Sequence, residues 1–124
     1  MSGLLVDTSI WIDHLRRGDE MLRQLLLQGR VLGHPMITGE IALGSLADRA
    51  SILRLLQNLP QATRATDAEV FGLIEGNALF GLGLGLVDVH LLAATLLNPG
   101  TRLWTRDRKL GEAAATIGIA AAVD

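Results

Sequence analysis

The sequence LLVDTSIWIDHL at residues 4–15 begins as a short apolar run and passes through an acid into a helical pattern. The run Leu4–Asp7 has the length of a buried strand, and the pattern that follows through Leu15 has the spacing of a helix. The same passage from apolar run to acid to helix returns later in the chain. A regular alternation of strand and helix predicts an α/β fold with a parallel sheet.

Further strands are expected at Arg30–Gly33, Gln61–Thr66, Arg102–Thr105 and Ile117–Val123. Helices are expected over Glu20–Gln28, Thr38–Leu46, Ala50–Leu59, Asp67–Leu79, a segment starting near Asp88, and Asp107–Thr116. There is no repeat, linker or low-complexity tract. The sequence therefore predicts one domain over residues 1–124, with a central parallel sheet of four to five strands and helices on both faces.

The amino-acid composition limits the types of catalytic and metal-binding site that the chain can form. The chain has 124 residues, no cysteine and three histidines, so thiolate nucleophiles, Cys-ligated zinc and iron–sulfur clusters are excluded. Carboxylates remain as hard ligands. The net charge of −2 argues against bulk electrostatic attraction to nucleic acid, although acids gathered at one site would weaken that argument.

One apolar stretch is long enough to cross a bilayer. From Gly76 to Thr101 the only formally charged residue is Asp88. Its glycines and Pro99 divide it into a helix end, a glycine-rich connection and a second helix, so burial within the protein is expected and a membrane span is not. With no signal peptide ahead of Asp7, a cytoplasmic location is expected.

Four acids stand at or near predicted helix starts after apolar runs: Asp7, Glu40, Asp88 and Asp107. Any one of them could simply cap its helix. As a set, they fall where strand-to-helix junctions meet along the carboxyl edge of a parallel sheet. Two carboxylates 4 Å apart repel by about 4 kcal/mol at an effective dielectric near 20, so either several of the acids are protonated or a divalent cation lies among them, and oxygen-only ligands select Mg²⁺ or Mn²⁺. Such a site is typical of metal-assisted phosphodiester hydrolysis.

Four motifs in series carry a family resemblance: residues 4–15, the segment HPMITGEIALG at 34–44, GLVDVHLLA at 85–93, and LWTRD at 103–107. Their order and spacing resemble PIN-domain ribonucleases, and more closely the VapC-type toxins of bacterial toxin–antitoxin pairs. The resemblance spans the whole chain.

This resemblance implies a PIN fold and a metal-dependent endoribonuclease acting as the toxin of a type II pair. Asp7, Glu40, Asp88 and Asp107 are then both the catalytic residues and the Mg²⁺ or Mn²⁺ ligands, with supporting hydroxyls at Thr8, Ser9 and Thr105. The implied partners are an RNA substrate such as tRNA or rRNA, a VapB-type antitoxin and a second copy of the chain.

Basic residues are concentrated beside the last acid, at Arg102, Arg106, Arg108 and Lys109. Cations in the first turn of a helix oppose its dipole, and binding to an RNA backbone would explain that cost. Asp13 is expected to pair with Arg16 or Arg17, and Asp19 to be a surface charge.

Three alternatives stay open. The chain could be a non-catalytic RNA-binding or protein-interaction module that keeps the acids for stability. It could also be a PIN nuclease of housekeeping RNA processing. Finally, His14, His34 and His90 could supply metal-free acid–base cleavage, which would survive EDTA.

Overall fold

A short parallel sheet lies at the centre of the molecule. The computed structural model describes residues 3–123. Its strands are β1 (Leu4–Val6), β2 (Val31–Leu32) and β3 (Arg102–Trp104), in the order β2-β1-β3. Leu4 lies opposite Val31 on one side and Arg102 on the other. The strand that the opening motif predicts is therefore the central one.

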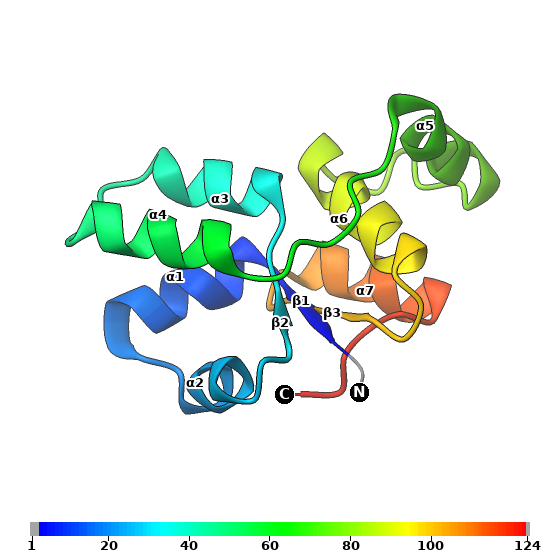
Figure 1. The fold of residues 1–124 in the computed structure, drawn as a ribbon. Helices are drawn as coiled ribbons and strands as arrows, with labels where there is room; N and C mark the ends of the chain where they lie inside the picture. Colours follow the sequence, from blue (N-terminus) through cyan, green and yellow to red (C-terminus); the bar gives the residue numbers. More distant parts are fainter. Residues whose placement is uncertain (1–2, 124) are drawn as a thin grey trace.

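Seven helices surround this sheet in the described residues. They are α1 (Thr8–Arg17), α2 (Glu20–Leu27), α3 (Pro35–Ala42), α4 (Arg49–Asn58), α5 (Asp67–Gly76), α6 (Leu86–Leu97) and α7 (Arg108–Ile117). Figure 1 shows α1 to α4 on one side of the strands and α5 to α7 on the other. The predicted α/β class with helices on both sides of a parallel sheet is confirmed.

The expected count of four to five strands is wrong. Residues 61–66 and 117–123 each contribute one isolated parallel bridge, Gly33 with Gln61 and Leu103 with Ala120. At the first bridge the Gln61 amide turns back and donates to the carbonyl oxygens of Leu59 and Leu56 at the end of α4, at 2.8 and 3.1 Å. The chain there is tied to the helix end and does not run on as a strand.

Gly33 packs closely against the segment that it bridges. A Cβ atom at this position would lie 2.6 Å from Gln61 Nε2 and 3.1 Å from the Leu56 carbonyl oxygen, so a larger residue would require the Gln61 side chain to move. Both outer segments thus extend the parallel order of the sheet by a single residue pair each.

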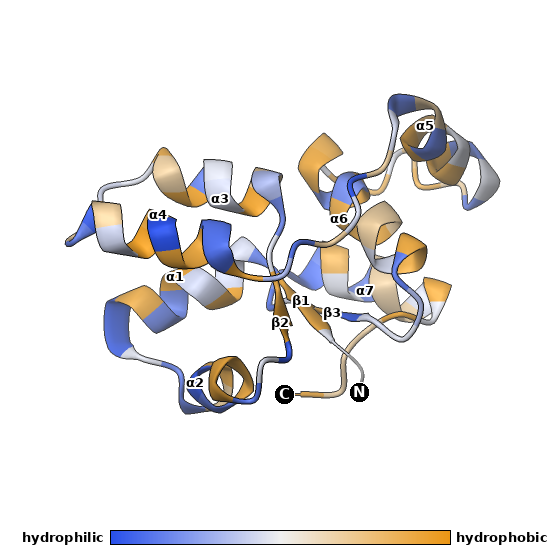
Figure 2. Ribbon diagram, viewed as in Figure 1, coloured by the Kyte–Doolittle hydropathy of each residue, from blue (hydrophilic) through white to orange (hydrophobic). Residues whose placement is uncertain are grey.

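The apolar stretch of residues 76–101 supplies part of the core. Every residue of α6 from Val89 to Thr95 is buried, and the strands are among the most hydrophobic parts of the chain in Figure 2. In the described part of the chain, no helix is long and apolar enough to span a membrane.

Candidate active site

The parallel strands bring separate acids to one edge of the sheet. Asp7 directly follows β1, and Asp107 comes three residues after β3. Because β1 and β3 run side by side, the Asp7 N–H donates to the carbonyl oxygen of Trp104 at 2.9 Å. Asp88, at the third position of α6, enters the same region, since its charge interacts with those of Asp7 and Asp107. Three of the four predicted acids therefore share the carboxyl edge.

Asp7 occupies the N-cap position of α1 without capping it. Its side chain accepts no hydrogen bond from the helix backbone. Instead Oδ2 accepts from the hydroxyls of Ser9 at 2.9 Å and Thr105 at 2.7 Å. The residue is only 7% exposed. Helix capping therefore does not account for this carboxylate, which is held instead by two hydroxyls from α1 and from the segment after β3.

The third supporting hydroxyl holds Glu40. Thr8 Oγ1 donates to Glu40 Oε1 at 2.6 Å, which ties α3 to the start of α1. The expected position of Glu40 near a helix start is wrong. α3 begins at Pro35, with His34 as its N-cap, so Glu40 lies in the second turn. Proline is favoured at a first helical position, and it moves the start upstream of Thr38.

The pKa of Asp88 is raised at this edge of the sheet. Burial raises the pKa of Asp88, and the charges of Asp107 and Asp7 raise it further, against a hydrogen bond from the Gly85 N–H that lowers it. Asp107 has a structural role as well, because its Oδ1 accepts from the Leu110 N–H at 2.9 Å and caps α7. In this structure the Asp107 carboxylate is thus a helix cap.

The donor chemistry fits a hard divalent cation. The predicted acids and hydroxyls of the described residues offer oxygen ligands, and a cation would offset the negative charges of Asp107 and Asp7, which add to the effect of burial in raising the pKa of Asp88. As the side chains of the described residues stand, no three of them form a ready-made metal-binding group.

The four basic candidates are not brought together. Arg102 begins β3 at the opposite end of the strands, and its guanidinium donates to the Gly118 carbonyl oxygen at 2.6 Å. A three-residue strand thus separates it from the site. Arg108 is exposed and lies 3.9 Å from Glu112. Lys109 lies against Gly83, where a Cβ would be 2.6 Å from its Nζ.

Arg106 is occupied by two acids that sequence reasoning placed elsewhere. Its guanidinium bonds to Asp13 at 2.8 Å and to Asp19 at 2.6 Å. Asp13 does approach Arg17, at 3.6 Å, but its shorter contact is to Arg106. In the sequence, Arg106 is 93 positions from Asp13 and 87 positions from Asp19. Helical periodicity relates only residues a few positions apart, so it could not predict these two ion pairs.

The histidines do not form a catalytic pair at this edge. His34 and His90 are buried, and His14 Nδ1 accepts from the Asp19 N–H at 3.0 Å. Burial, aided by the charges of His90 and Arg64, lowers the pKa of His34 to about 4. His34 Nδ1 accepts from the Met36 N–H, so this side chain acts as a helix cap.

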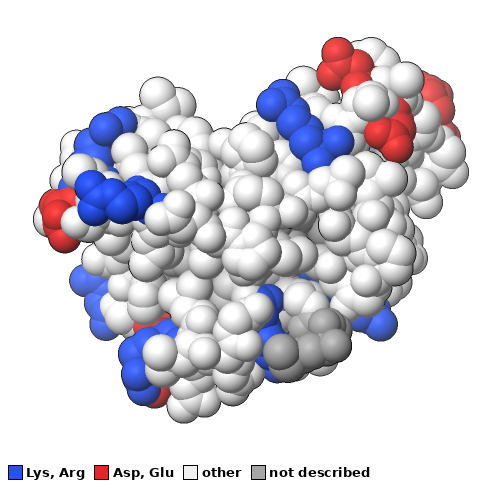
Figure 3. Space-filling model, viewed as in Figure 1, with Lys and Arg blue, Asp and Glu red and all other residues white. Residues whose placement is uncertain are grey.

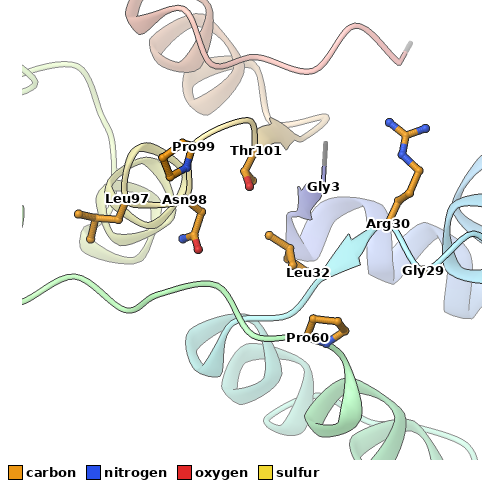
Figure 4. Close-up of a pocket in the computed structure, with 9 residues that line it drawn as sticks. All are labelled: Gly3, Gly29, Arg30, Leu32, Pro60, Leu97, Asn98, Pro99 and Thr101. Carbon is orange, nitrogen blue, oxygen red and sulfur yellow. The ribbon is translucent and has the colours of Figure 1, made fainter. Parts of the chain in front are cut away.

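A cavity of about 370 Å³ lies at the other edge of the sheet. Figure 4 shows that its lining comes from the starts of the strands, including Gly3 and Thr101, and from Arg30, Pro60 and Asn98. No acidic side chain is among its lining residues. This hollow lacks the groups that the predicted chemistry requires.

Comparison with known proteins identifies the family. No protein-family model matches the chain. Two curated relatives, both named Ribonuclease VapC32, come from Mycobacterium tuberculosis strains CDC 1551 / Oshkosh and ATCC 25618 / H37Rv. Each is 46% identical over 119 residues, which cover 96% of this chain and 96% of the relative. With its four motifs and its acids at one sheet edge, this chain belongs to the VapC family of ribonucleases.

Proposed function

We propose that the chain is the toxin of a type II toxin–antitoxin pair and an endoribonuclease that depends on Mg²⁺ or Mn²⁺. The observation that carries the proposal is the meeting of Asp7 and Asp107 at the carboxyl ends of neighbouring parallel strands, where Thr105, two residues before Asp107, donates to Asp7 Oδ2 at 2.7 Å. Carboxylates that converge at such an edge favour a divalent cation. Membership of a family whose relatives are named ribonucleases gives the class of reaction.

The cation would be held by Asp7, Asp88 and Asp107, with Glu40 joining from α3. When bound, it supplies Lewis acidity to water and to the scissile phosphate. Ser9 and Thr105 fix Asp7 through Oδ2 and leave Oδ1 to the site, and Thr8 orients Glu40. The chain's own residues thus keep the carboxylates in place, and the reaction needs no 2′-hydroxyl.

The exposed basic residues beside the site suit the substrate. Arg108 and Lys109 form the first turn of α7, next to Asp107. Contacts from these side chains to the RNA backbone would attract the substrate irrespective of base sequence. An RNA such as tRNA or rRNA is the substrate class that we propose.

A VapB-type antitoxin is the proposed protein partner, together with a second copy of the chain. A cavity of about 310 Å³ lies beside the site, between α1 and the α3–α4 segment. Ile12, Leu15, Ile41 and Ile52 line it, and Glu40 borders it. An apolar segment of the antitoxin seated there would lie against one of the four acids.

The activity is tested with purified protein and total cellular RNA in MgCl2, MnCl2 or EDTA. We expect discrete cleavage products with either metal, none in EDTA, and none from Asp7→Asn. The matched control is Asp67→Asn, an exposed acid at the start of α5, where acidic side chains gather in Figure 3. It should cleave like the wild type. Cleavage by Asp7→Asn at the wild-type rate would contradict the assignment.

The toxin role is tested in cells. Expression of the chain should arrest growth, and co-expression of the small open reading frame beside its gene should relieve the arrest. Asp7→Asn should be harmless at the same protein level. Harmless wild-type expression together with RNA binding but no cleavage would favour a non-catalytic module.

A further inference from the structure

We propose that Arg106 is a positioning residue of this site, which acts through Asp13 and Asp19 to fix the hydroxyls that hold Asp7. The inference rests on the proposed function, because its readout is RNA cleavage. It assigns Arg106 a role inside the protein and not on the RNA.

The Arg106 side chain is engaged on three sides. Nη1 lies 2.8 Å from Asp13 Oδ2, Nη2 lies 2.6 Å from Asp19 Oδ2, and Cζ lies 5.5 Å from the centroid of the Trp104 ring. All three charged side chains are partly buried, with 31% of Arg106, 29% of Asp13 and 14% of Asp19 exposed. A guanidinium that bridges two carboxylates over an indole face is more strongly held than a single surface pair.

The three partners belong to three different elements. Asp13 lies in α1, Asp19 is the N-cap of α2, and Trp104 ends β3. One side chain therefore fixes the α1–α2 corner against the segment that leaves β3. Burial alone would raise the pKa of Asp19, but the hydrogen bond and charge of Arg106, with the Leu22 N–H, hold it below its ordinary value. Asp19 is thus kept ionised for this bridge.

The main chain of Arg106 leads directly to the site. Its N–H donates to Ser9 Oγ at 3.1 Å, and that hydroxyl donates to Asp7. On one side of Arg106 stands Thr105, whose hydroxyl also donates to Asp7, and on the other stands Asp107, whose N–H donates to Thr105 Oγ1 at 3.0 Å. Fixing Arg106 therefore fixes both donors to Asp7 at once.

The existing contacts of Arg106 argue against direct RNA contact by this residue. Its guanidinium is held between two carboxylates, so a phosphate would have to compete with both acids for it. Small displacements of catalytic groups lower kcat more than they change substrate affinity. The two roles therefore predict opposite kinetic signatures.

The experiment compares kcat and KM on an RNA oligonucleotide that contains a cleavage site mapped in total RNA. Arg106→Ala should lower kcat about tenfold or more, with KM within about twofold of wild type. Asp19→Asn keeps an oxygen acceptor for the Leu22 N–H and should lower kcat about fivefold with the same unchanged KM. The double variant should be no worse than Arg106→Ala, because one bridge is lost in each.

Two further arginine variants calibrate the result. Arg108→Ala, in the proposed RNA contact, should raise KM and leave kcat unchanged. Arg23→Ala removes an exposed arginine from its pair with Glu20 on α2 and should change neither. Circular dichroism would establish whether each variant is folded, and Asp19→Asn carries the test if Arg106→Ala is not folded.

A raised KM for Arg106→Ala would overturn the proposal. So would a lowered KM for Asp19→Asn, because a released guanidinium that gains RNA affinity is an RNA-binding residue. These outcomes leave cleavage by the wild type intact, and so leave the proposed function standing. Absence of cleavage by the wild type would overturn the proposed function and this role with it.

Discussion

The two edges of one small sheet differ in the way that function requires. The amino edge has a cavity of about 370 Å³ with no acid in its lining. At the carboxyl edge Asp7, Asp88 and Asp107 interact, and two hydroxyls converge on one carboxylate oxygen. Charge and hydrogen bonding, not the size of a hollow, are the grounds on which we propose that the chemistry takes place at the carboxyl edge.

The largest effect should come from Asp88. Asp88→Asn should lower cleavage at least about 100-fold, because it removes a charge that the cation requires. The same change should raise the Tm of the metal-free protein at pH 7. Folding raises the pKa of Asp88, so the stability linked to this group is present below its unfolded value of 3.8 and lost as pH rises through the folded value.

Cleavage assays and thermal melts in EDTA measure both parts of this prediction. Asp67→Asn serves as the control for replacing an acid on an exposed helix: it should leave cleavage unchanged and should not raise Tm, because an acid in the first turn of α5 interacts favourably with the helix dipole. A variant that loses activity because it is less stable would contradict the account, since the predicted loss of activity comes with a gain in stability.

A smaller effect concerns the pH dependence of protein stability that results from burial of the His34 side chain. Burial first, then the charges of His90 and Arg64, lower its pKa from 6.5 to about 4. Between pH 6.5 and about 4, His34 therefore binds a proton in the unfolded chain but not in the folded chain. Stability linked to His34 is full above pH 6.5 and should fall by about 3 kcal/mol as pH drops toward 4.

Urea unfolding at a series of pH values measures this dependence. The matched variant is His34→Asn, which retains an acceptor for the Met36 N–H but cannot titrate. Its unfolding free energy should fall less steeply between pH 6.5 and 4. An identical slope in the two proteins would show that other groups cause the loss.

Two threonines on either side of β3 give the most closely matched comparison. Thr105→Val removes one of the two hydroxyls on Asp7 and should lower kcat about tenfold. Thr101→Val makes the same chemical change at the amino edge, where Thr101 lines the cavity, and should leave kcat and KM within about twofold. Equal decreases in kcat for the two variants would contradict the proposal that only the carboxyl edge takes part in the reaction.

Much of this edge follows from local sequence. The runs before Asp7 and Asp107 predict strands, and parallel strands must bring their ends together, so the meeting of these acids could be anticipated. The number of strands could not be anticipated. It depends on how far the segments around residues 61 and 120 run parallel to the neighbouring strands, and each forms only one isolated bridge. The place of Glu40 was misjudged because Pro35 starts α3 early.

The sequence could not predict the long-range ion pairs either, because they depend on how distant segments come together in the fold. The spacing of Asp13 from Arg16 and Arg17 fits a helical pair, and Asp13 does approach Arg17, at 3.6 Å. Its shorter contact, however, is with Arg106, which folding brings from 93 positions away. Arg102 was grouped with Arg106 by proximity in sequence, yet β3 directs the two to opposite ends of the sheet.

We propose that the carboxylates of the carboxyl edge bind a divalent cation that cleavage requires. This binding can be measured by calorimetric titration of MnCl2 into the metal-free wild type, Asp7→Asn and Asp67→Asn. We predict saturable binding to the wild type and to Asp67→Asn, and its loss in Asp7→Asn. Binding to Asp7→Asn with wild-type affinity, or no binding to a wild-type protein that cleaves RNA in EDTA, would contradict the account.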